Sequence, residues 1–265
     1  MCTNEQIYVR KGAEEMGNPQ REQQIMDILK LQKYASVNDL ARGLYTSPSS
    51  IRRDIRRLEL QGLVSRSHGG VSLISAQPGS APFSIRAHEN KREKSAIVRK
   101  ASKLIRQGSS IFIDSSTTSL NFANHLSAEM NIKVFTNNIQ LAHLLASKQI
   151  PSYCIGGLVS RHNDVITTGQ FALSMLEHIY VDMLFFTSAA LSENGVITDN
   201  NEDETAIRKG MLLHAKEKVF LCPRDRFPLM ATYKVTDIGA LDYVVSDEAL
   251  PQSFTSKYGE VSFIS

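Results

Sequence analysis

The sequence predicts an α/β protein in two parts: an N-terminal winged helix-turn-helix joined to a Rossmann-like, largely parallel α/β domain. Before residue 74, three short amphipathic helical patterns precede a strand-like alternation and a Gly-Gly pair. After residue 108, short β-rich runs alternate with amphipathic helical patterns, as in a parallel sheet covered on both faces. The boundaries that we expect are a disordered N-terminal extension at 1–18, the winged helix-turn-helix at 19–73, a linker at 74–82 and the α/β domain at 83–265.

The third helical pattern has the clearest start and stop signals. Ser47 can cap the first turn and Pro48 is pre-shaped for it, so we expect a helix from Pro48 to about Gln61, ended by Gly62. Apolar residues recur at i, i+4 and i+7, which gives one apolar face opposite a cationic face. The apolar residues are Ile51, Ile55 and Leu58.

Two further helices and a hairpin complete the front part. We expect helices at 21–32 and 37–44, the second capped by Ser36. Residues 63–68 alternate like a strand, and Gly69-Gly70 permits a tight reversal. Three helices followed by a hairpin make a winged helix-turn-helix.

In this fold the helix after the turn enters the major groove of double-stranded DNA, and flanking cations hold phosphates. A lone arginine-rich helix is more often a solvated face, but here a capped helix, its predecessor and a basic wing coincide, which favours DNA. We expect base contacts from Ser49, Ser50 and Arg53. Contacts to phosphates or to the minor groove are expected from Arg52, Arg56, Arg57, Arg66 and His68. The capping serines Ser36 and Ser47 complete the candidate DNA-binding set.

The charge distribution supports this division of labour. The 265 residues carry a formal charge of +3, but residues 1–110 hold 19 Lys and Arg against 10 Asp and Glu, and residues 111–265 hold 11 against 17. The basic front fits a polyanionic partner, and the acidic rear argues that the second part does not lie on nucleic acid. A basic helix is expected at 90–107. Its cations extend the DNA-binding surface or attract an anionic ligand, or, in the commoner case, they form a solvated face.

Other classes of protein are disfavoured. The three cysteines, Cys2, Cys154 and Cys222, have neither metal spacing nor a CxxC motif, and we interpret the last two as small core residues in a reducing cytoplasm. No run approaches the ~18 apolar residues of a membrane span, and the first residues lack the apolar core of a secretory signal. With no Walker loop, HExxH or clustered metal ligands, we expect no cofactor, no metal site and no membrane partner.

The α/β part alternates regularly. Expected strands are 111–114, 134–136, 153–155, 184–187, 219–222, 243–245 and 261–264, and expected helices include 119–130, 139–148, 170–179 and 203–215. In parallel sheets of this kind, ligands bind at the carboxyl ends of the strands. Functional residues are therefore expected just after each strand.

Polar and glycine residues cluster at those positions. Five consecutive hydroxyl residues follow Asp114, at an expected strand-to-helix junction where side-chain donors and unpaired amides together suit a phosphate or carboxylate. A serine-threonine run alone is more often a capped turn, but the loops after the next strands supply further polar groups and an arginine. The candidate ligand residues are Asp114, Ser115, Ser116, Thr117, Thr118, Ser119, Thr136, Asn137, Asn138, Gly156, Gly157, Arg161 and Ser188.

The string SIRRDIRRLELQGLVSRSHGG, with VNDLARGL ahead of it, resembles the N-terminal signature of the DeoR family of bacterial transcriptional regulators. The strand-end loops resemble the family's C-terminal pattern. This resemblance implies an operator-binding head and a domain that senses a metabolite, usually a phosphorylated sugar, on a fold shared with sugar-phosphate isomerases. Two departures stand out: Ser116 replaces a customary glycine, and Pro223 and Arg226 stand where the family commonly has an aspartate and a lysine. Arg226 joins the candidate effector set on this basis.

We therefore expect a cytoplasmic DNA-binding regulator, a repressor of a carbohydrate-catabolism operon that responds to a phosphorylated sugar or a similar anion. A homo-oligomer, dimer or tetramer, is expected because two heads on spaced half-sites gain effective concentration. One alternative is a sugar-phosphate isomerase-like enzyme with a DNA-binding head, in which Asp114 or Glu204 is the general base. A nucleoid-type protein without an effector is the other.

Overall fold

The structure is a computed structural model that describes residues 19–32, 34–60, 63–67, 70–73, 83–87, 89–160 and 163–265. The chain divides into two compact units, Met1–Ala76 and Gln77–Ser265. The expected N-terminal extension and linker lie outside the described residues. So do Gly62, His68, Gly69 and Arg161.

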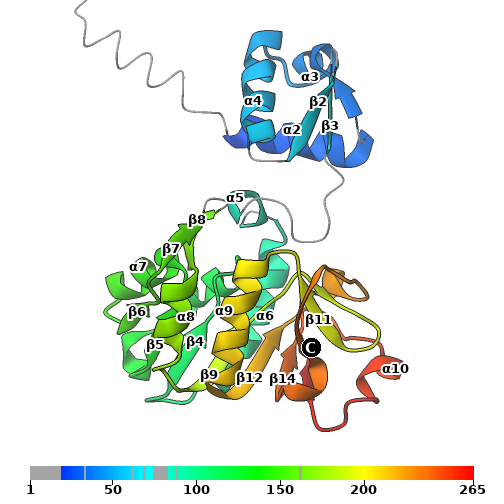
Figure 1. Cartoon of the computed structure of the whole chain (residues 1–265). Coiled ribbons are helices and arrows are strands. Elements are labelled where there is room, and N and C mark those ends of the chain that lie inside the picture. Colours follow the sequence, from blue (N-terminus) through cyan, green and yellow to red (C-terminus); the bar gives the residue numbers. More distant parts are fainter. Residues whose placement is uncertain are drawn as a thin grey trace, which may run out of the picture. The chain divides into compact units, whose positions relative to one another are not determined.

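The first unit combines helices with a small antiparallel sheet (Figure 1). Its helices are α2 (Pro19–Gln32), α3 (Val37–Gly43) and α4 (Pro48–Leu60), and its strands are β1 (Tyr34–Ser36), β2 (Val64–Ser67) and β3 (Gly70–Leu73). The strand order is β1-β3-β2. The predicted winged helix-turn-helix is confirmed. Strand β1 was not predicted, because three residues between two helices are too few to show an alternation.

The expected caps and apolar face are present in this unit. The Ser36 Oγ accepts a hydrogen bond from the Asp39 amide at 3.1 Å, and the Ser47 Oγ accepts one from the Ser50 amide at 3.2 Å. Both hydroxyls thus satisfy amides that a helix start leaves unpaired. The α4 residues Ile51, Ile55 and Leu58 are buried together with Ile25, Leu29, Leu40, Val64 and Val71.

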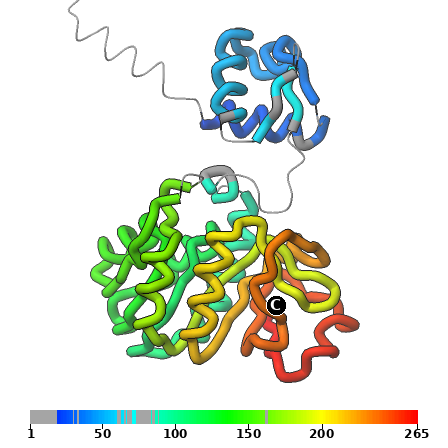
Figure 2. Tube along the Cα trace, viewed as in Figure 1, coloured from blue at the N-terminus to red at the C-terminus, as the bar shows by residue number. Residues whose placement is uncertain are grey.

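A seven-stranded parallel sheet forms the centre of the second unit (Figure 1). Its strands are β4 (Ser110–Ile113), β5 (Lys133–Thr136), β6 (Ser152–Cys154), β9 (Val181–Phe186), β12 (Ala215–Leu221), β14 (Tyr243–Val245) and β15 (Ser262–Ile264). Every neighbouring pair is parallel, in the order β15-β14-β12-β9-β4-β5-β6. The chain therefore moves outward from β4 to β6, returns to β9 beside β4, and continues in the opposite direction, as the colours of Figure 2 show. The predicted Rossmann-like sheet is confirmed, and its topological switch point lies between β4 and β9.

Helices cover both faces of this sheet and create two apolar cores. Helices α8 (Gln170–Leu176) and α9 (Glu202–Leu213) pack into one core with Phe112, Phe186 and Phe220. Helices α6 (Lys91–Ala101) and α7 (Ile139–Ser147) pack into the other with Ile111 and Phe185. Smaller elements are α5 (Phe83–Arg86), α10 (Gln252–Thr255), η1 (Ser102–Leu104), η4 (Arg224–Arg226), η5 (Ile238–Ala240), the hairpin β7 (Leu158–Ser160) and β8 (Asn163–Thr168), and a sheet of β10 (Ala190–Leu191), β11 (Val196–Asp199) and β13 (Tyr233–Asp237).

The α-helix predicted at 119–130 is not present. That stretch forms two 3₁₀ segments, η2 (Ser119–Asn124) and η3 (Ala128–Met130). The Asn121 side chain donates to the Thr117 carbonyl at 3.0 Å, and the Asn121 backbone N–H donates to the Thr118 carbonyl at 3.0 Å. These bonds occupy the carbonyls that an α-helix would need, because asparagine competes locally for the backbone. The hydroxyl run therefore does not precede an α-helix dipole.

Two residues differ in exposure from what their sequence context indicates. Lys94, in the basic helix expected at 90–107, is buried and donates to the Arg86 and Glu89 carbonyls. Cys154, expected in the core, is exposed because β6 is the edge strand of the sheet. Cys222 is buried, as expected.

Candidate DNA interface and effector site

The outward face of α4 carries exposed cations. Arg52, Arg53 and Arg56 are exposed and make no ion pair among the residues that the structure describes. At the start of the helix, the Ser47 Oγ lies 2.9 Å from the hydroxyls of Ser49 and Ser50. This face therefore offers three arginines and a hydroxyl cluster, as a helix that reads a groove requires.

Arg57 does not belong to this face, contrary to the expectation from the sequence. It is three-quarters buried, its Nε lies 2.6 Å from Glu22 of α2, and it also pairs with the buried carboxylate of Asp54. Arg21 of α2 pairs with the same carboxylate, and this hydrogen bond raises the pKa of Arg21. Asp54 and Arg57 lie three residues apart and so share the side of α4 that faces α2. The Arg57 guanidinium ties the two helices together instead of facing solvent.

The other expected DNA contacts are partly engaged. The Ser36 hydroxyl donates to Asp39 at 2.6 Å while it caps α3. Arg66 of the wing lies 2.5 Å from Glu59, but its side chain is half exposed. An exposed pair of this kind contributes little and can exchange one partner for another.

The expected effector loops meet at the carboxyl end of the sheet. The Asn138 Nδ2 donates to the Ser115 carbonyl at 3.3 Å, which joins the loop after β5 to the loop after β4. The Ile155 amide donates to the Thr136 carbonyl at 2.8 Å, and the Thr167 amide donates to the Asn137 carbonyl at 3.0 Å. Loops that are far apart in the sequence are thus connected by direct hydrogen bonds.

The hydroxyl run is buried at the switch point between β4 and β9. Ser116 and Ser119 use their hydroxyls internally: they bond each other at 2.9 Å, and the Ser116 Oγ accepts from the Ser119 amide at 3.0 Å. The hydroxyls of Ser115, Thr117 and Thr118 make no hydrogen bond to any described residue. Their oxygens are not among the buried unpaired side-chain atoms of the described residues, so solvent reaches them, and these three hydroxyls are the groups of the loop that a ligand can contact.

Asp114 holds this loop and is not open to a ligand, contrary to its place in the expected effector set. Its Oδ1 accepts from the Ser116 amide at 3.2 Å and from the Ser119 hydroxyl, and its Oδ2 accepts from the Thr187 amide at 3.2 Å. The Arg208 Nε is 3.1 Å from the same Oδ2. Both oxygens are fully used because the carboxylate lies where β4, β9 and α9 meet.

Arg208 is a buried hub that sequence reasoning missed. Its three guanidinium nitrogens each lie 3.1 Å from a carboxylate, those of Asp114, Asp199 and Glu204. Burial acts to lower the pKa of Arg208, but these three carboxylate charges raise it above its usual value. The i, i+4 spacing of Glu204 and Arg208 is the one available signal, and it indicates only that the two side chains share one side of a helix. Nothing in the sequence shows that this side of α9 faces β4.

Ser188 supports the same hub. Its hydroxyl donates to the Thr198 carbonyl at 2.7 Å and lies 3.0 Å from Asp199. Although burial opposes it, Arg208 and the hydrogen bonds from Asn200 and Ser188 hold the pKa of Asp199 below its usual value. The expected ligand contact from Ser188 is therefore not available, because its hydroxyl is bonded within the protein.

Further cations lie close to this network. The Arg226 side chain is four-fifths buried and donates to the Ala189 carbonyl at 3.3 Å. Burial lowers the pKa of Arg86, the charge of Glu204 opposes that shift, and the charges of Arg226 and Arg208 add to it. Burial, followed by the charges of Arg86 and Arg226, lowers the pKa of Lys94 to about 8. Three cations therefore lie close enough to influence one another, with the carboxylates of Glu204 and Asp225 also within range.

Two glycines follow β6, and the second, Gly157, lets the chain pass close to the backbone of β8. Gly157 has φ +146°, and a Cβ atom at this residue would lie 2.5 Å from the Thr168 carbonyl oxygen. A side chain here would clash with the β7–β8 hairpin, so the glycine is required for this packing. Gly156 is exposed, with open space around its Cα.

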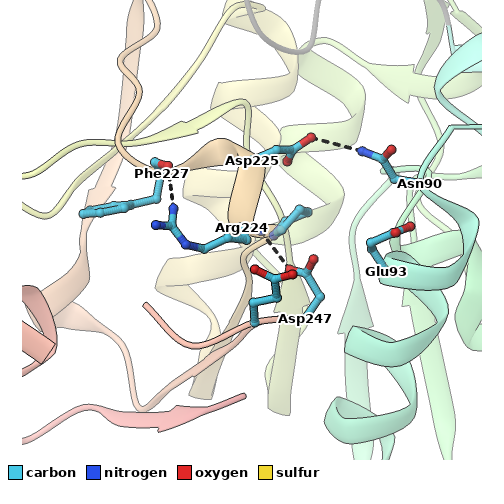
Figure 3. A pocket seen from close by; sticks show the side chains of 8 residues that line it. Asn90, Glu93, Arg224, Asp225, Phe227 and Asp247 are labelled. Carbon is cyan, nitrogen blue, oxygen red and sulfur yellow. Dashed lines mark hydrogen bonds between the residues drawn. The ribbon is translucent and has the colours of Figure 1, made fainter. Parts of the chain in front are cut away.

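A separate cavity of about 430 Å³ lies beyond the ends of β12 and β14 (Figure 3). In this cavity the Asn90 side chain donates to Asp225 at 3.1 Å, and the Arg224 amide donates to Asp247 at 2.8 Å. Its remaining lining residues are Glu93, Pro223, Phe227 and Glu248. The cavity is mostly acidic and so does not suit a phosphate.

No group of three or more His, Cys, Asp or Glu side chains in the described part of the chain could hold a metal ion. No described helix has the length and hydropathy to cross a membrane.

Comparison with known proteins covers both units. Residues 21–77 match the DeoR-like helix-turn-helix domain, and residues 89–248 match the DeoR C terminal sensor domain. A transcriptional regulator of Haemophilus influenzae is 28% identical over 92% of this chain and 94% of its own length. The Escherichia coli transcriptional repressor CsqR is 29% identical over 91% and 92%. The glycerol-3-phosphate regulon repressor of Escherichia coli is 27% identical over 90% and 94%.

Proposed function

Because the chain belongs to the DeoR family of DNA-binding transcriptional regulators, we propose that it represses a carbohydrate operon in the cytoplasm and that a phosphorylated sugar modulates its hold on the operator. The main observation behind this proposal is the buried loop at the switch point of the parallel sheet. There, Ser115, Thr117 and Thr118 present hydroxyls that no described residue binds. The remainder of the loop is fixed by Asp114 and Arg208.

The DNA-binding role falls to the exposed face of α4. Arg53, with Ser49 and Ser50, is proposed to reach base edges, while Arg52 and Arg56 hold phosphates. Arg66 is proposed to add a contact from the wing. Arg57 is removed from the DNA-binding set because it pairs with Glu22 and Asp54.

The effector role falls to the switch-point loop and the nearby cations. A phosphate oxygen accepts hydrogen bonds, so hydroxyl donors and buried positive charge match it. Arg226, Arg86 and Lys94 influence one another electrostatically, and an anion among them would relieve their repulsion. The names of the relatives fit this proposal, since one is a glycerol-3-phosphate regulon repressor.

An oligomer is part of this proposal. A single small head makes few contacts, and two heads on spaced half-sites gain effective concentration. We therefore propose a dimer or a tetramer on the operator.

The enzymatic alternative is less well supported by the geometry. The Asp114 carboxylate already accepts two hydrogen bonds on each oxygen, so it has no free position for a substrate proton. Glu204 is paired with Arg208 at 3.1 Å. The sequence relatives are transcriptional regulators and repressors.

Calorimetry of the full chain against a panel of phosphorylated sugars tests the effector role. We expect stoichiometric binding of at least one member with no turnover, and a hundredfold excess over the dissociation constant should stabilise the C-terminal unit by about 2.7 kcal/mol. The unphosphorylated sugar should bind far more weakly. Chemical conversion of the ligand would favour the enzyme. The absence of detectable binding for every sugar phosphate in the panel would favour a DNA-binding protein without an effector.

A further inference from the structure

Asn137, in the loop after β5, has a buried side chain with one unpaired end. Only 1% of the residue is exposed. Its Nδ2 donates to the Thr167 carbonyl at 3.0 Å, and its Oδ1 has no hydrogen-bond partner. The assignment of the two ends follows from chemistry: a carbonyl accepts only, so the amide nitrogen must face Thr167 and the oxygen must point the other way.

The surrounding hydrogen bonds keep Asn137 in this position. Its carbonyl receives the Thr167 amide at 3.0 Å and the Thr167 hydroxyl at 3.2 Å. The next residue, Asn138, caps α7 through its Oδ1 and donates from its Nδ2 to the Ser115 carbonyl. The backbone and the amide nitrogen of Asn137 are therefore both fixed, so its oxygen cannot turn toward a partner elsewhere in the protein.

The chemistry of this oxygen differs from that of the hydroxyls on the neighbouring loop. Ser115, Thr117 and Thr118 can donate to a phosphate, whereas an amide oxygen can only accept. The doubly ionised phosphate of an ester offers it no donor. A hydroxyl group does, and an acceptor buried in a site selects strongly for the ligand that pairs with it.

We propose that Asn137 is a specificity-determining residue of the effector site, whose Oδ1 accepts a hydrogen bond from a hydroxyl group of the ligand. The site then takes polyhydroxylated phosphate esters in preference to bare phosphate or to esters without hydroxyls. This inference rests on the proposed function for the location of the site. It adds the residue that distinguishes a sugar from other anions.

The test uses the full chain and calorimetry. The hydroxylated probes are glycerol 3-phosphate, ribose 5-phosphate and glucose 6-phosphate. Two anions without carbon-bound hydroxyls, n-propyl phosphate and inorganic phosphate, are compared with them. Unphosphorylated glycerol, ribose and glucose complete the panel. Asn137→Leu keeps the size of the side chain and removes the acceptor, and Asn137→Ala replaces it if the leucine variant does not fold. Thr167→Val is the matched control, because it removes a hydroxyl bonded to the same backbone and leaves the Asn137 oxygen in place.

We expect at least one hydroxylated ester to bind wild type about tenfold or more tightly than n-propyl phosphate. Asn137→Leu should abolish that preference and leave the affinity for n-propyl phosphate unchanged, while Thr167→Val should retain the preference. An equal preference in wild type and Asn137→Leu would overturn the inference and leave the proposed function standing. Binding of the unphosphorylated polyols alone, lost in Asn137→Leu, would uphold the inference and overturn the phosphate assignment. Silence of every probe would overturn both.

Discussion

Replacement of Arg208 by methionine tests whether the buried charge network organises the switch point. The substitution keeps an unbranched side chain of similar length and removes the positive charge that three carboxylates share at 3.1 Å. Asp114 is 1% exposed at its side chain and would be left as a buried charge without its ion-pair partner, held by three hydrogen bonds alone. Breaking a buried ion pair in this way costs about 3–5 kcal/mol. We expect a loss of that size in the free energy of unfolding of the C-terminal unit at pH 7.

The pH dependence of this loss has a definite sign. In wild type the pKa of Asp199 is lowered, so its contribution to stability is present above its unfolded pKa, about 3.9, and is lost only as pH falls below that value. Without Arg208, burial would raise the pKa of the Asp199 carboxyl, and the folded state would gain stability by taking up a proton. The difference between wild type and Arg208→Met should therefore shrink by about 1 kcal/mol or more between pH 7 and pH 5.

Urea denaturation followed by circular dichroism at pH 7 and pH 5 measures both quantities. Arg208→Lys is the matched control, since it keeps the charge and loses the three-way fork, and its loss should be smaller and nearly independent of pH. A loss below about 1 kcal/mol for Arg208→Met, or the same loss at both pH values, would refute the role assigned to this arginine.

Four further predictions concern the other elements. Arg53→Ala should weaken operator binding by about 1–3 kcal/mol and relax the preference at one base position in salt-titrated binding assays. Arg57→Ala should instead lower the free energy of unfolding of the first unit by about 1–3 kcal/mol, because it breaks the link from α4 to α2; a pure loss of DNA affinity with unchanged stability would contradict this. Thr117→Val should reduce ligand-induced thermal stabilisation and leave the ligand-free melting temperature nearly unchanged, whereas a loss of about 0.5–2 kcal/mol without ligand would show that this hydroxyl caps a turn. Because burial lowers the pKa of Lys94 to about 8, wild type should gain up to about 3 kcal/mol in stability as pH rises from about 8 to 10.4; Lys94→Met should lack this gain, and parallel pH profiles would contradict the burial of the charge.

The sequence was sufficient to predict the elements with regular periodicity. All seven strands of the parallel sheet coincide with expected β-rich runs, and the caps at Ser36 and Ser47 are where helix-start signals placed them. These features depend on local patterns of apolar residues and on short-range hydrogen bonds. Strand β1 and the β7–β8 hairpin depend on pairing with distant or irregular segments, so no local pattern indicated them.

The charged residues of the site were harder to predict, because their role depends on which element faces them. Arg57 looks like its neighbours Arg53 and Arg56 in the sequence, but Asp54 and Glu22 turn it inward. Arg208 was not predicted as a site residue, because only the folded structure shows that α9 packs beside the end of β4, where Asp114 follows the strand. Helical periodicity gives the direction of a side chain from its own helix, whereas ion pairs across elements require the tertiary arrangement.

The affinity of the full chain for its operator, measured with and without a phosphorylated sugar, tests the central claim most directly. Fluorescence anisotropy on a genomic duplex that the protein selects would give both dissociation constants at one salt concentration, because affinities at different salt are not comparable. The proposed mechanism predicts that one phosphorylated sugar changes the operator dissociation constant by about fivefold or more, as a typical coupling free energy would. The unphosphorylated sugar should change it little. An operator affinity that stays the same at saturating concentrations of every phosphorylated sugar that binds the chain would contradict the claim that this site controls DNA binding.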